Sequence, residues 1–91
     1  SVVIMGETYL IKHRSPKDKT AWAETDLTKQ TIVMSPKLDA TGFRNTLGHE
    51  IAHVVLAKTG LNVFLSADQE EKYCDTLGRA LIMLLEENTK E

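Results

Sequence analysis

His49 and His53 flank Glu50 in the segment His49-Glu50-Ile51-Ala52-His53, an H-E-x-x-H motif. In an α-helix, residues four apart lie about one turn apart on the same side, so both imidazoles could bind one metal ion. Glu50 is poorly placed to be a third ligand, but it is well placed to take a proton from a water molecule beside the metal. Two nitrogen ligands and an adjacent general base are what a zinc hydrolase needs. The motif therefore predicts a zinc site with Glu50 as the catalytic base.

A third protein ligand is expected, because catalytic zinc sites combine three protein ligands with one open position. Glu71 and Asp75 lie four positions apart in a later helical segment, so their carboxylates face the same way. We expect Glu71 to bind the metal and Asp75 to accept the N–H of His49, which would fix the tautomer of that ligand. Glu70 is the alternative third ligand. Its companion one turn on would be Cys74, and a thiol is a poorer acceptor than a carboxylate.

The H-E-x-x-H motif lies in a predicted helix from about Thr41 to Thr59, with Asp39 or Thr41 as its N-cap. Gly60 suits the C-terminus of this helix, because glycine readily adopts the left-handed cap conformation. The apolar residues that recur at helical spacing are Phe43, Leu47, Ile51, Val54 and Val55. We expect this apolar face to pack on the core.

A second helix, which would carry the acidic residues, is predicted from about Ala67 to Glu87. Ser66 and Gln69 fit the S-x-x-Q capping box at its start. The expected apolar stripe consists of Tyr73, Leu77, Leu81, Leu84 and Leu85. Gly78 lies on this stripe and Gly48 directly precedes the first histidine, so the absence of side chains there would let the two helices approach closely.

Three short strands are predicted before the helices, at residues 8–13, 20–24 and 30–34. The last two should pair as an antiparallel hairpin, because the connection between them is short. Strands followed by helices favour an α+β fold over a parallel α/β sheet. We therefore expect a small antiparallel sheet of about three strands packed on two long helices.

The composition excludes several classes of protein. The chain has 91 residues, 42% of them hydrophobic and 26% charged, and we expect residues 1–91 to form one domain. A net charge of −2 gives no reason to expect binding to nucleic acid or to an anionic membrane. No apolar run approaches the roughly 20 residues that a membrane span needs. The first residues do not resemble a signal peptide, and a single cysteine forms no internal disulfide, so a cytoplasmic location is expected.

Other residues that could do chemistry are expected to have structural roles. We expect His13 to be an exposed strand-end residue, Tyr9 and Tyr73 to lie at the edge of the core, and Trp22 to anchor the hairpin in the core. The apolar segment 61–65 is expected to pack beneath the two helices. The alternatives are an oxyanion donor for His13 or either tyrosine, a substrate platform for Trp22, and a binding lip for the segment.

The motif HEIAH, followed 18 positions later by E-x-x-x-D, resembles the gluzincin branch of the zincin metallopeptidases. The compact order of ETDLTKQTIVMSPKLDATGFRNTLGHEIAHVV and EEKYCDTLGRALIMLLEENTKE resembles small phage and prophage zincin-like proteins, which are akin to the ImmA/IrrE-type peptidases that cleave repressors. The resemblance covers the chain from about Tyr9 to Asn88.

This resemblance implies roles that agree with the spacing of the residues. His49, His53 and Glu71 would be the zinc ligands, Glu50 the catalytic base and Asp75 a partner outside the ligand set. The strand Gln30–Met34 would be an edge strand that pairs with an extended peptide substrate. No tyrosine or histidine downstream of the motif matches the residue that stabilises the oxyanion in larger gluzincins.

Three functions remain open from the sequence. The first is a minimal zinc metallopeptidase that acts on a protein or peptide substrate. The second is a non-catalytic zincin-like module in which zinc mainly stabilises a small core. The third is an α+β domain without a metal, such as a phage accessory or regulatory protein. Glu50 favours the first, since a purely structural site needs no general base, whereas a fourth protein ligand from Cys74 or His13 would favour the second.

Overall fold

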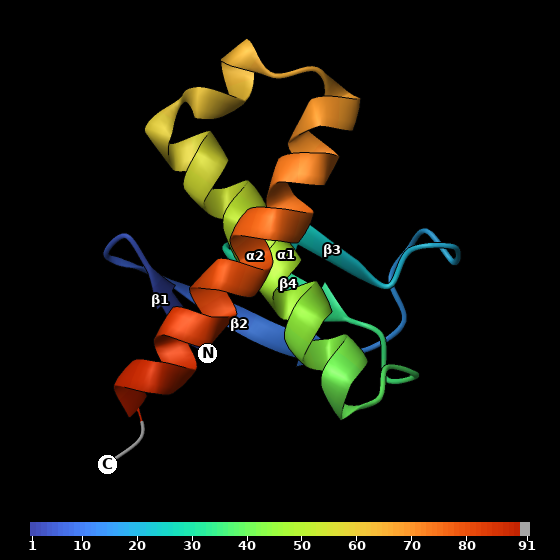
Figure 1. The fold of residues 1–91 in the computed structure, drawn as a ribbon. Helices are drawn as coiled ribbons and strands as arrows, with labels where there is room; N and C mark the ends of the chain where they lie inside the picture. Colours follow the sequence, from blue (N-terminus) through green and yellow to red (C-terminus); the bar gives the residue numbers. More distant parts are fainter. Residues whose placement is uncertain (90–91) are drawn as a thin grey trace.

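The computed structural model describes residues 1–89 and has an α+β fold, as expected, in which one helix lies between a sheet and a second helix (Figure 1). The elements in chain order are β1 (Val2–Ile4), β2 (Glu7–His13), β3 (Ala23–Asp26), β4 (Thr31–Met34), α1 (Ala40–Thr59), the 3-10 helix η1 (Leu61–Phe64) and α2 (Ala67–Thr89). Among the described residues, no helix is long and apolar enough to cross a membrane.

The sheet has four strands in the order β1-β2-β4-β3, so the expected count of three was too low. It is also mixed, because β2 and β4 pair in parallel while the other two pairs are antiparallel. β1 and β2 form a hairpin through Met5 and Gly6, which both have positive φ. Such turns usually carry Asn-Gly or Asp-Gly, so methionine at the first position hid the hairpin from a sequence pattern.

The expected hairpin between the second and third predicted strands is confirmed, but its first strand begins later and its place in the sheet differs. β3 begins at Ala23 and pairs antiparallel with β4, with Thr25 opposite Ile32. β4 lies between β2 and β3, so the expectation that the strand at Gln30–Met34 would be an edge strand was wrong. The residues of β4 are largely buried, as suits a central strand. β3 is the edge strand on this side of the sheet, and β1 is the edge strand on the other side.

α1 has the ends that the sequence indicates. Asp39, rather than Thr41, is the N-cap, and its side chain accepts a hydrogen bond of 2.7 Å from the backbone N–H of Gly42. Gly60 ends the helix in the left-handed conformation with φ of 78°. The expected apolar face of α1 packs against buried residues of the sheet, so α1 is fixed over it.

α2 crosses over α1 on the side away from the sheet (Figure 1). Ser66 and Gln69 form the expected capping box, with reciprocal bonds of 2.9 and 3.1 Å. The backbones of the two helices meet at Gly48 and Gly78, where a Cβ added at Gly48 would lie 2.5 Å from the carbonyl oxygen of Gly78. The expectation that these glycines permit a close approach is therefore confirmed.

The side of α2 that faces the core matches the expected stripe only in part. Leu77 and Leu81 pack against the core clusters, as expected, and Cys74 and Ile82 are buried as well. Tyr73, Leu84 and Leu85 are instead more than half exposed. The buried side is shifted because Cys74 and Gly78, one helical turn apart, both face α1. Tyr9 is buried in the core as a strand residue, with a relative exposure of 1%.

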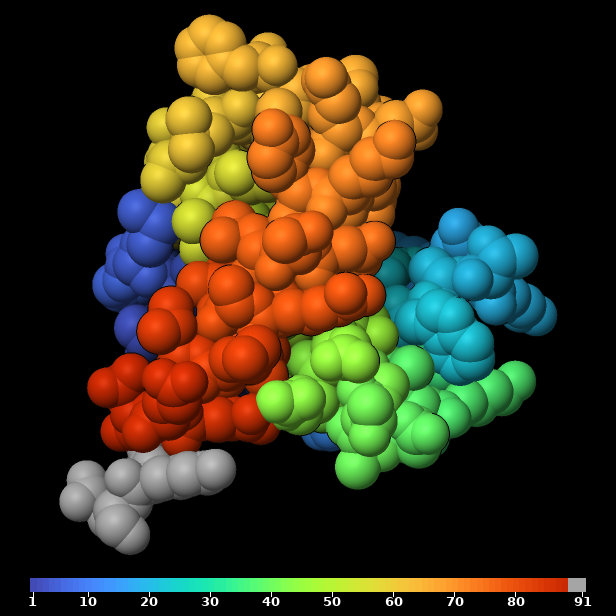
Figure 2. Space-filling view, in the orientation of Figure 1, coloured from blue at the N-terminus to red at the C-terminus, as the bar shows by residue number. Residues whose placement is uncertain are grey.

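The segment 61–65 does not pack beneath the helices, in contrast to the expectation. Leu61, Val63 and Phe64 of η1 are all exposed, and only Leu65 packs against the cluster around Cys74. η1 connects α1 to α2 at the upper end of the molecule in Figure 2, beyond the helix crossing.

Candidate metal centre

The predicted zinc ligands lie together where α1 and α2 face each other. The Nε2 atoms of His49 and His53 are 3.0 Å apart, because the two residues are separated by one turn of α1. The Glu71 carboxylate reaches across from α2, with its oxygens 2.9 Å from His49 Nε2 and 3.2 Å from His53 Nε2. The structure therefore brings two imidazole nitrogens and one carboxylate to the same point.

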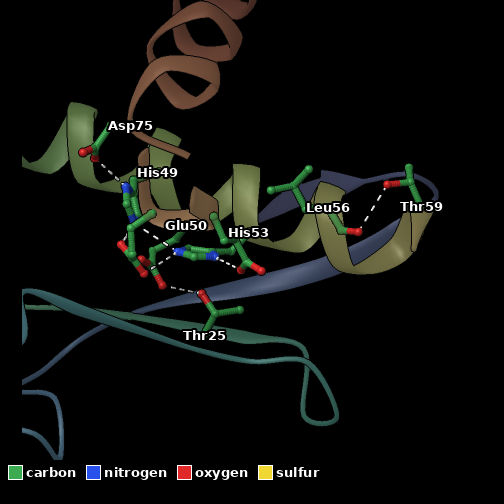
Figure 3. A network of polar contacts seen from close by, with 9 residues as sticks. Thr25, His49, Glu50, His53, Leu56, Thr59 and Asp75 are labelled. Carbon is green, nitrogen blue, oxygen red and sulfur yellow. Dashed lines mark hydrogen bonds and ion pairs between the residues drawn. The ribbon is translucent and has the colours of Figure 1, made fainter. Parts of the chain in front are cut away.

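Each histidine also has a carboxylate at its other ring nitrogen. Asp75 lies 2.7 Å from Nδ1 of His49, which is the contact that the spacing predicts. Glu70 lies 2.6 Å from Nδ1 of His53, a contact that the sequence pattern does not indicate, because it offers Glu70 only as the alternative third ligand. Figure 3 shows the His49 ring with Asp75 on one side and with Glu50 and His53 on the other. Ionised carboxylates only accept hydrogen bonds, so both contacts assign the ring proton to Nδ1.

The Nε2 atoms of the two rings point at each other and at Glu71, with separations of 2.9 to 3.2 Å. A neutral ring with its proton on Nδ1 would offer the lone pair of its Nε2 atom to a metal ion at this point. A tetrahedral zinc ion with ligands at about 2.0–2.2 Å separates its donor atoms by roughly 3.3–3.6 Å. The three side chains therefore fit a zinc ion with small adjustments, and the chemistry of the donors suits this metal.

Glu50 faces away from the convergence point toward the sheet. Its Oε1 accepts a hydrogen bond of 2.7 Å from the hydroxyl of Thr25 on β3, as the dashed line in Figure 3 shows. The ligand-type atoms of Glu50, His49 and His53 nevertheless lie within 4.8 Å of one another. Glu50 is thus adjacent to the convergence point while its other oxygen remains free to meet a water molecule there.

Cys74 belongs to a second group of ligand-type atoms, with His53 and Glu70, also within 4.8 Å. Burial raises the pKa of the Cys74 thiol to about 12, and the charges of Glu70 and Glu71 add to this shift. A thiol with so high a pKa is protonated when no metal ion is bound and is a poor nucleophile. Cys74 is fully buried and packs with Ala52 and Leu56 as a small hydrophobic residue.

The groove beside the centre contains residues that the sequence did not assign to the site. It has a volume of about 520 Å³, and it is lined by Trp22 of the segment before β3, by Asn45 of α1 and by Arg79 of α2 as well as by the histidines. Trp22 is 56% exposed, so the expectation that it anchors the core was wrong. Arg79 could have been recognised from its spacing, since it follows Asp75 by one helical turn.

The residues considered as oxyanion donors lie elsewhere among the described residues. His13 stacks on Phe43 with ring centroids 5.5 Å apart, and Tyr9 is enclosed in the core. Tyr73 is exposed and lines a separate pocket with Gln69 and Lys72. None of the three lines the groove at the candidate metal centre.

Comparison with known protein families gives a match over nearly the whole chain. The family described as the IrrE N-terminal-like domain, Peptidase M78, matches residues 7–88. Comparisons with curated proteins and with solved structures gave no match. The matched range includes the histidines, the acidic residues of α2 and the edge strand β3. It agrees with the resemblance to ImmA/IrrE-type proteins that the motif and its spacing indicate. The chain therefore belongs to the IrrE N-terminal-like family of zincin-like, metallopeptidase-type domains.

Proposed function

We propose that this protein is a zinc-dependent peptidase that hydrolyses peptide bonds of a protein or peptide substrate. The observation that carries the proposal is the convergence of His49 Nε2, His53 Nε2 and both Glu71 oxygens within 3.2 Å, with Glu50 beside them. Family membership supports the same reaction class. Zinc held by these three residues would supply a Lewis acid that polarises the peptide carbonyl and acidifies water.

The residues of this chain would divide the remaining chemistry among them. Glu50 would take a proton from the attacking water and pass it to the leaving amine. The hydroxyl of Thr25 would keep the Glu50 carboxylate in place through the hydrogen bond of 2.7 Å. Asp75 and Glu70 would hold the two imidazole rings with Nε2 available for the metal.

The free edge of β3 is the proposed binding site for the substrate backbone. The backbone N–H of Ser35 donates to the carbonyl of Trp22, so Trp22 and every second residue after it bond to the β4 side. The intervening residues, Ala23 and Thr25, then present their backbone groups to the open edge. A peptide extended along this edge would pass directly over Glu50, because Thr25 contacts it.

The test is to replace Glu50 by glutamine in zinc-loaded protein. Glu50→Gln should retain one zinc ion per chain and lose cleavage of a peptide mixture by about a hundredfold or more, since general-base catalysis contributes about that factor. Glu87→Gln, the same change at an exposed position of α2, serves as the control and should cleave normally. Loss of zinc from Glu50→Gln would mean that Glu50 is a ligand and not the base.

A non-catalytic zinc module is the alternative, and the small size of the buried core favours it, because metal binding can supply folding free energy. The engagement of Glu50 by Thr25 at an open groove favours the peptidase. Zinc binding by the wild type without cleavage of any peptide in the mixture would support the module instead.

A further inference from the structure

Two pockets with different chemistry flank the proposed catalytic base. The groove on one side is lined by Ala21, Trp22 and Ala23, and a smaller pocket of about 240 Å³ on the other side is lined by Thr25 and Leu27. Both pockets are lined by Glu50 and His53, so they meet at the candidate metal centre. Together they follow β3 along its length, which makes them the two halves of one path for an extended peptide.

The pocket at the Leu27 end is suited to an apolar side chain. Its apolar lining residues are Leu27, which is 49% exposed, and Ala57 of α1, and Asn62 of η1 also lines it. The charged residues that line it are Glu50 and Glu70, and each is already engaged by a hydrogen bond within the protein. The other three residues of η1, Leu61, Val63 and Phe64, are exposed and apolar and add apolar surface next to Asn62.

The groove at the Trp22 end carries a cation. Arg79 is the only lysine or arginine among the described residues that line either pocket. Within residues 1–89 its guanidinium forms no hydrogen bond or ion pair, and Asp75, one turn earlier, contacts His49. Asn45 of α1 lines the same groove and could add a polar contact. An unpaired guanidinium presents several donors that suit a carboxylate.

The direction of the substrate follows from the strand that it joins. Antiparallel pairing is slightly more stable than parallel pairing, so a peptide should run antiparallel to β3. Its N-terminal half would then lie at Leu27 and its C-terminal half at Trp22 and Arg79. Arg79 follows Glu71 by about two turns of α2, so the two residues are about 12 Å apart along the helix. An extended peptide covers this distance with about two to four residues, counted from the candidate metal centre toward Arg79.

We propose that the protein selects peptides with an apolar side chain N-terminal to the scissile bond and with Asp or Glu about two to four residues C-terminal to it. The carboxylate is bound by Arg79, which is a specificity-determining residue of the groove. This inference rests on the proposed peptidase function and defines its substrate class.

The first experiment maps the bonds that the zinc-loaded protein cleaves in a tryptic digest of denatured proteins. Wild type should show Asp and Glu enriched about fivefold at the stated positions, because a partly exposed charge pair contributes modestly. Arg79→Glu should lose this enrichment and favour lysine there. Lys72→Glu, which reverses a charge on the same helix outside both pockets, should retain it. Cleavage with an unchanged profile in Arg79→Glu would overturn the inference and leave the peptidase function intact.

A binding experiment separates the failure of the inference from the failure of the proposed function. The probes are two fluorescent decapeptides of Ala and Ser with one Leu and, three residues later, either Glu or Lys. Zinc-loaded Glu50→Gln should bind the Glu peptide about tenfold more tightly, and adding Arg79→Glu should reverse the preference. Acid-selective binding without any cleavage would support the Arg79 site and contradict the peptidase function. Equal binding of the two peptides, or no binding, would overturn the inference.

Discussion

At the residue scale, each histidine of the candidate centre is held by a carboxylate of α2. Asp75 holds His49 and Glu70 holds His53, while Glu71 lies between the two Nε2 atoms. The three carboxylates therefore do different things although Glu70 and Glu71 are adjacent in the sequence. Adjacent residues of a helix point about 100° apart, which is why only one of them reaches the convergence point.

Replacing Glu70 by glutamine tests whether it positions His53 and is not itself a ligand. The amide can still accept a hydrogen bond but loses the charge, so we expect zinc affinity to fall by about tenfold to a hundredfold with one zinc ion still bound at saturation. Glu71→Gln should weaken binding far more. The measurement is a zinc titration against a competing chelator, with Glu87→Gln as the control. An equal loss of zinc affinity in Glu70→Gln and Glu71→Gln would contradict the roles assigned to the two residues.

Replacing Thr25 by valine tests the hydrogen bond to Glu50. Valine keeps the shape of the side chain and removes the donor, so we expect kcat to fall by about tenfold with zinc content unchanged, since one hydrogen bond to a charged group is lost. Thr25→Ser retains the hydroxyl and should restore most of the rate. A change in KM alone, or no rescue by serine, would show that Thr25 serves only to pack the strand.

The sequence indicated part of this site because helical spacing is local. His49, His53, Glu71 and Asp75 follow from residues four apart on a helix, and the structure brings them together. Thr25 could not be identified, because its contact with Glu50 joins residues 25 positions apart and depends on the register of β3. The role of Glu70 depends on how α2 is rotated against α1, which the sequence pattern did not indicate.

At the element scale, the crossing of α1 and α2 sets the distances within the site. Gly48 precedes His49, and Gly78 lies between Asp75 and Arg79 in sequence, so any separation of the helices at this crossing would move the proposed ligands apart. The ends of both helices were predictable because caps are local features. β1 and the position of β4 were not, because they depend on an unusual turn and on long-range pairing.

Replacing Gly48 by alanine should destabilise the protein by about 2 kcal/mol, because overpacking outweighs the better helix propensity of alanine. The new Cβ would lie 2.5 Å from the backbone oxygen of Gly78 and 2.7 Å from the side chain of Ile82. Gly42→Ala is the comparison, because the new Cβ at this position would meet only side-chain atoms. It should lower the free energy of unfolding by less than Gly48→Ala does. The measurement is urea unfolding, and equal stability of the two variants would contradict a close helix crossing.

At the scale of the whole molecule, the candidate centre joins α1 to α2 beside the edge of the sheet. The buried core is small, with two clusters that share α1. A metal ion at the centre would add a link between the helices through His49, His53 and Glu71. The stability of the fold should therefore depend on the metal.

Removal of the metal with a chelator should lower Tm by roughly 10–20 °C, because zinc at about a hundred times Kd contributes about 2.7 kcal/mol in a domain of this size. Differential scanning calorimetry of the zinc-loaded and chelated protein measures the shift. Readdition of zinc should restore Tm. His53→Ala should have the same Tm with and without the chelator, and a chelator-dependent Tm in that variant would place the metal elsewhere.

The most direct measurement of the central claim is the metal content of the purified protein by mass spectrometry, for wild type beside His53→Ala and Glu71→Ala. We expect about one zinc ion per chain in the wild type, which corresponds to a single site with three protein ligands, and loss or marked weakening in both variants. Wild-type protein that binds no zinc even after reconstitution would contradict a metal centre at His49, His53 and Glu71, and with it the proposed peptidase.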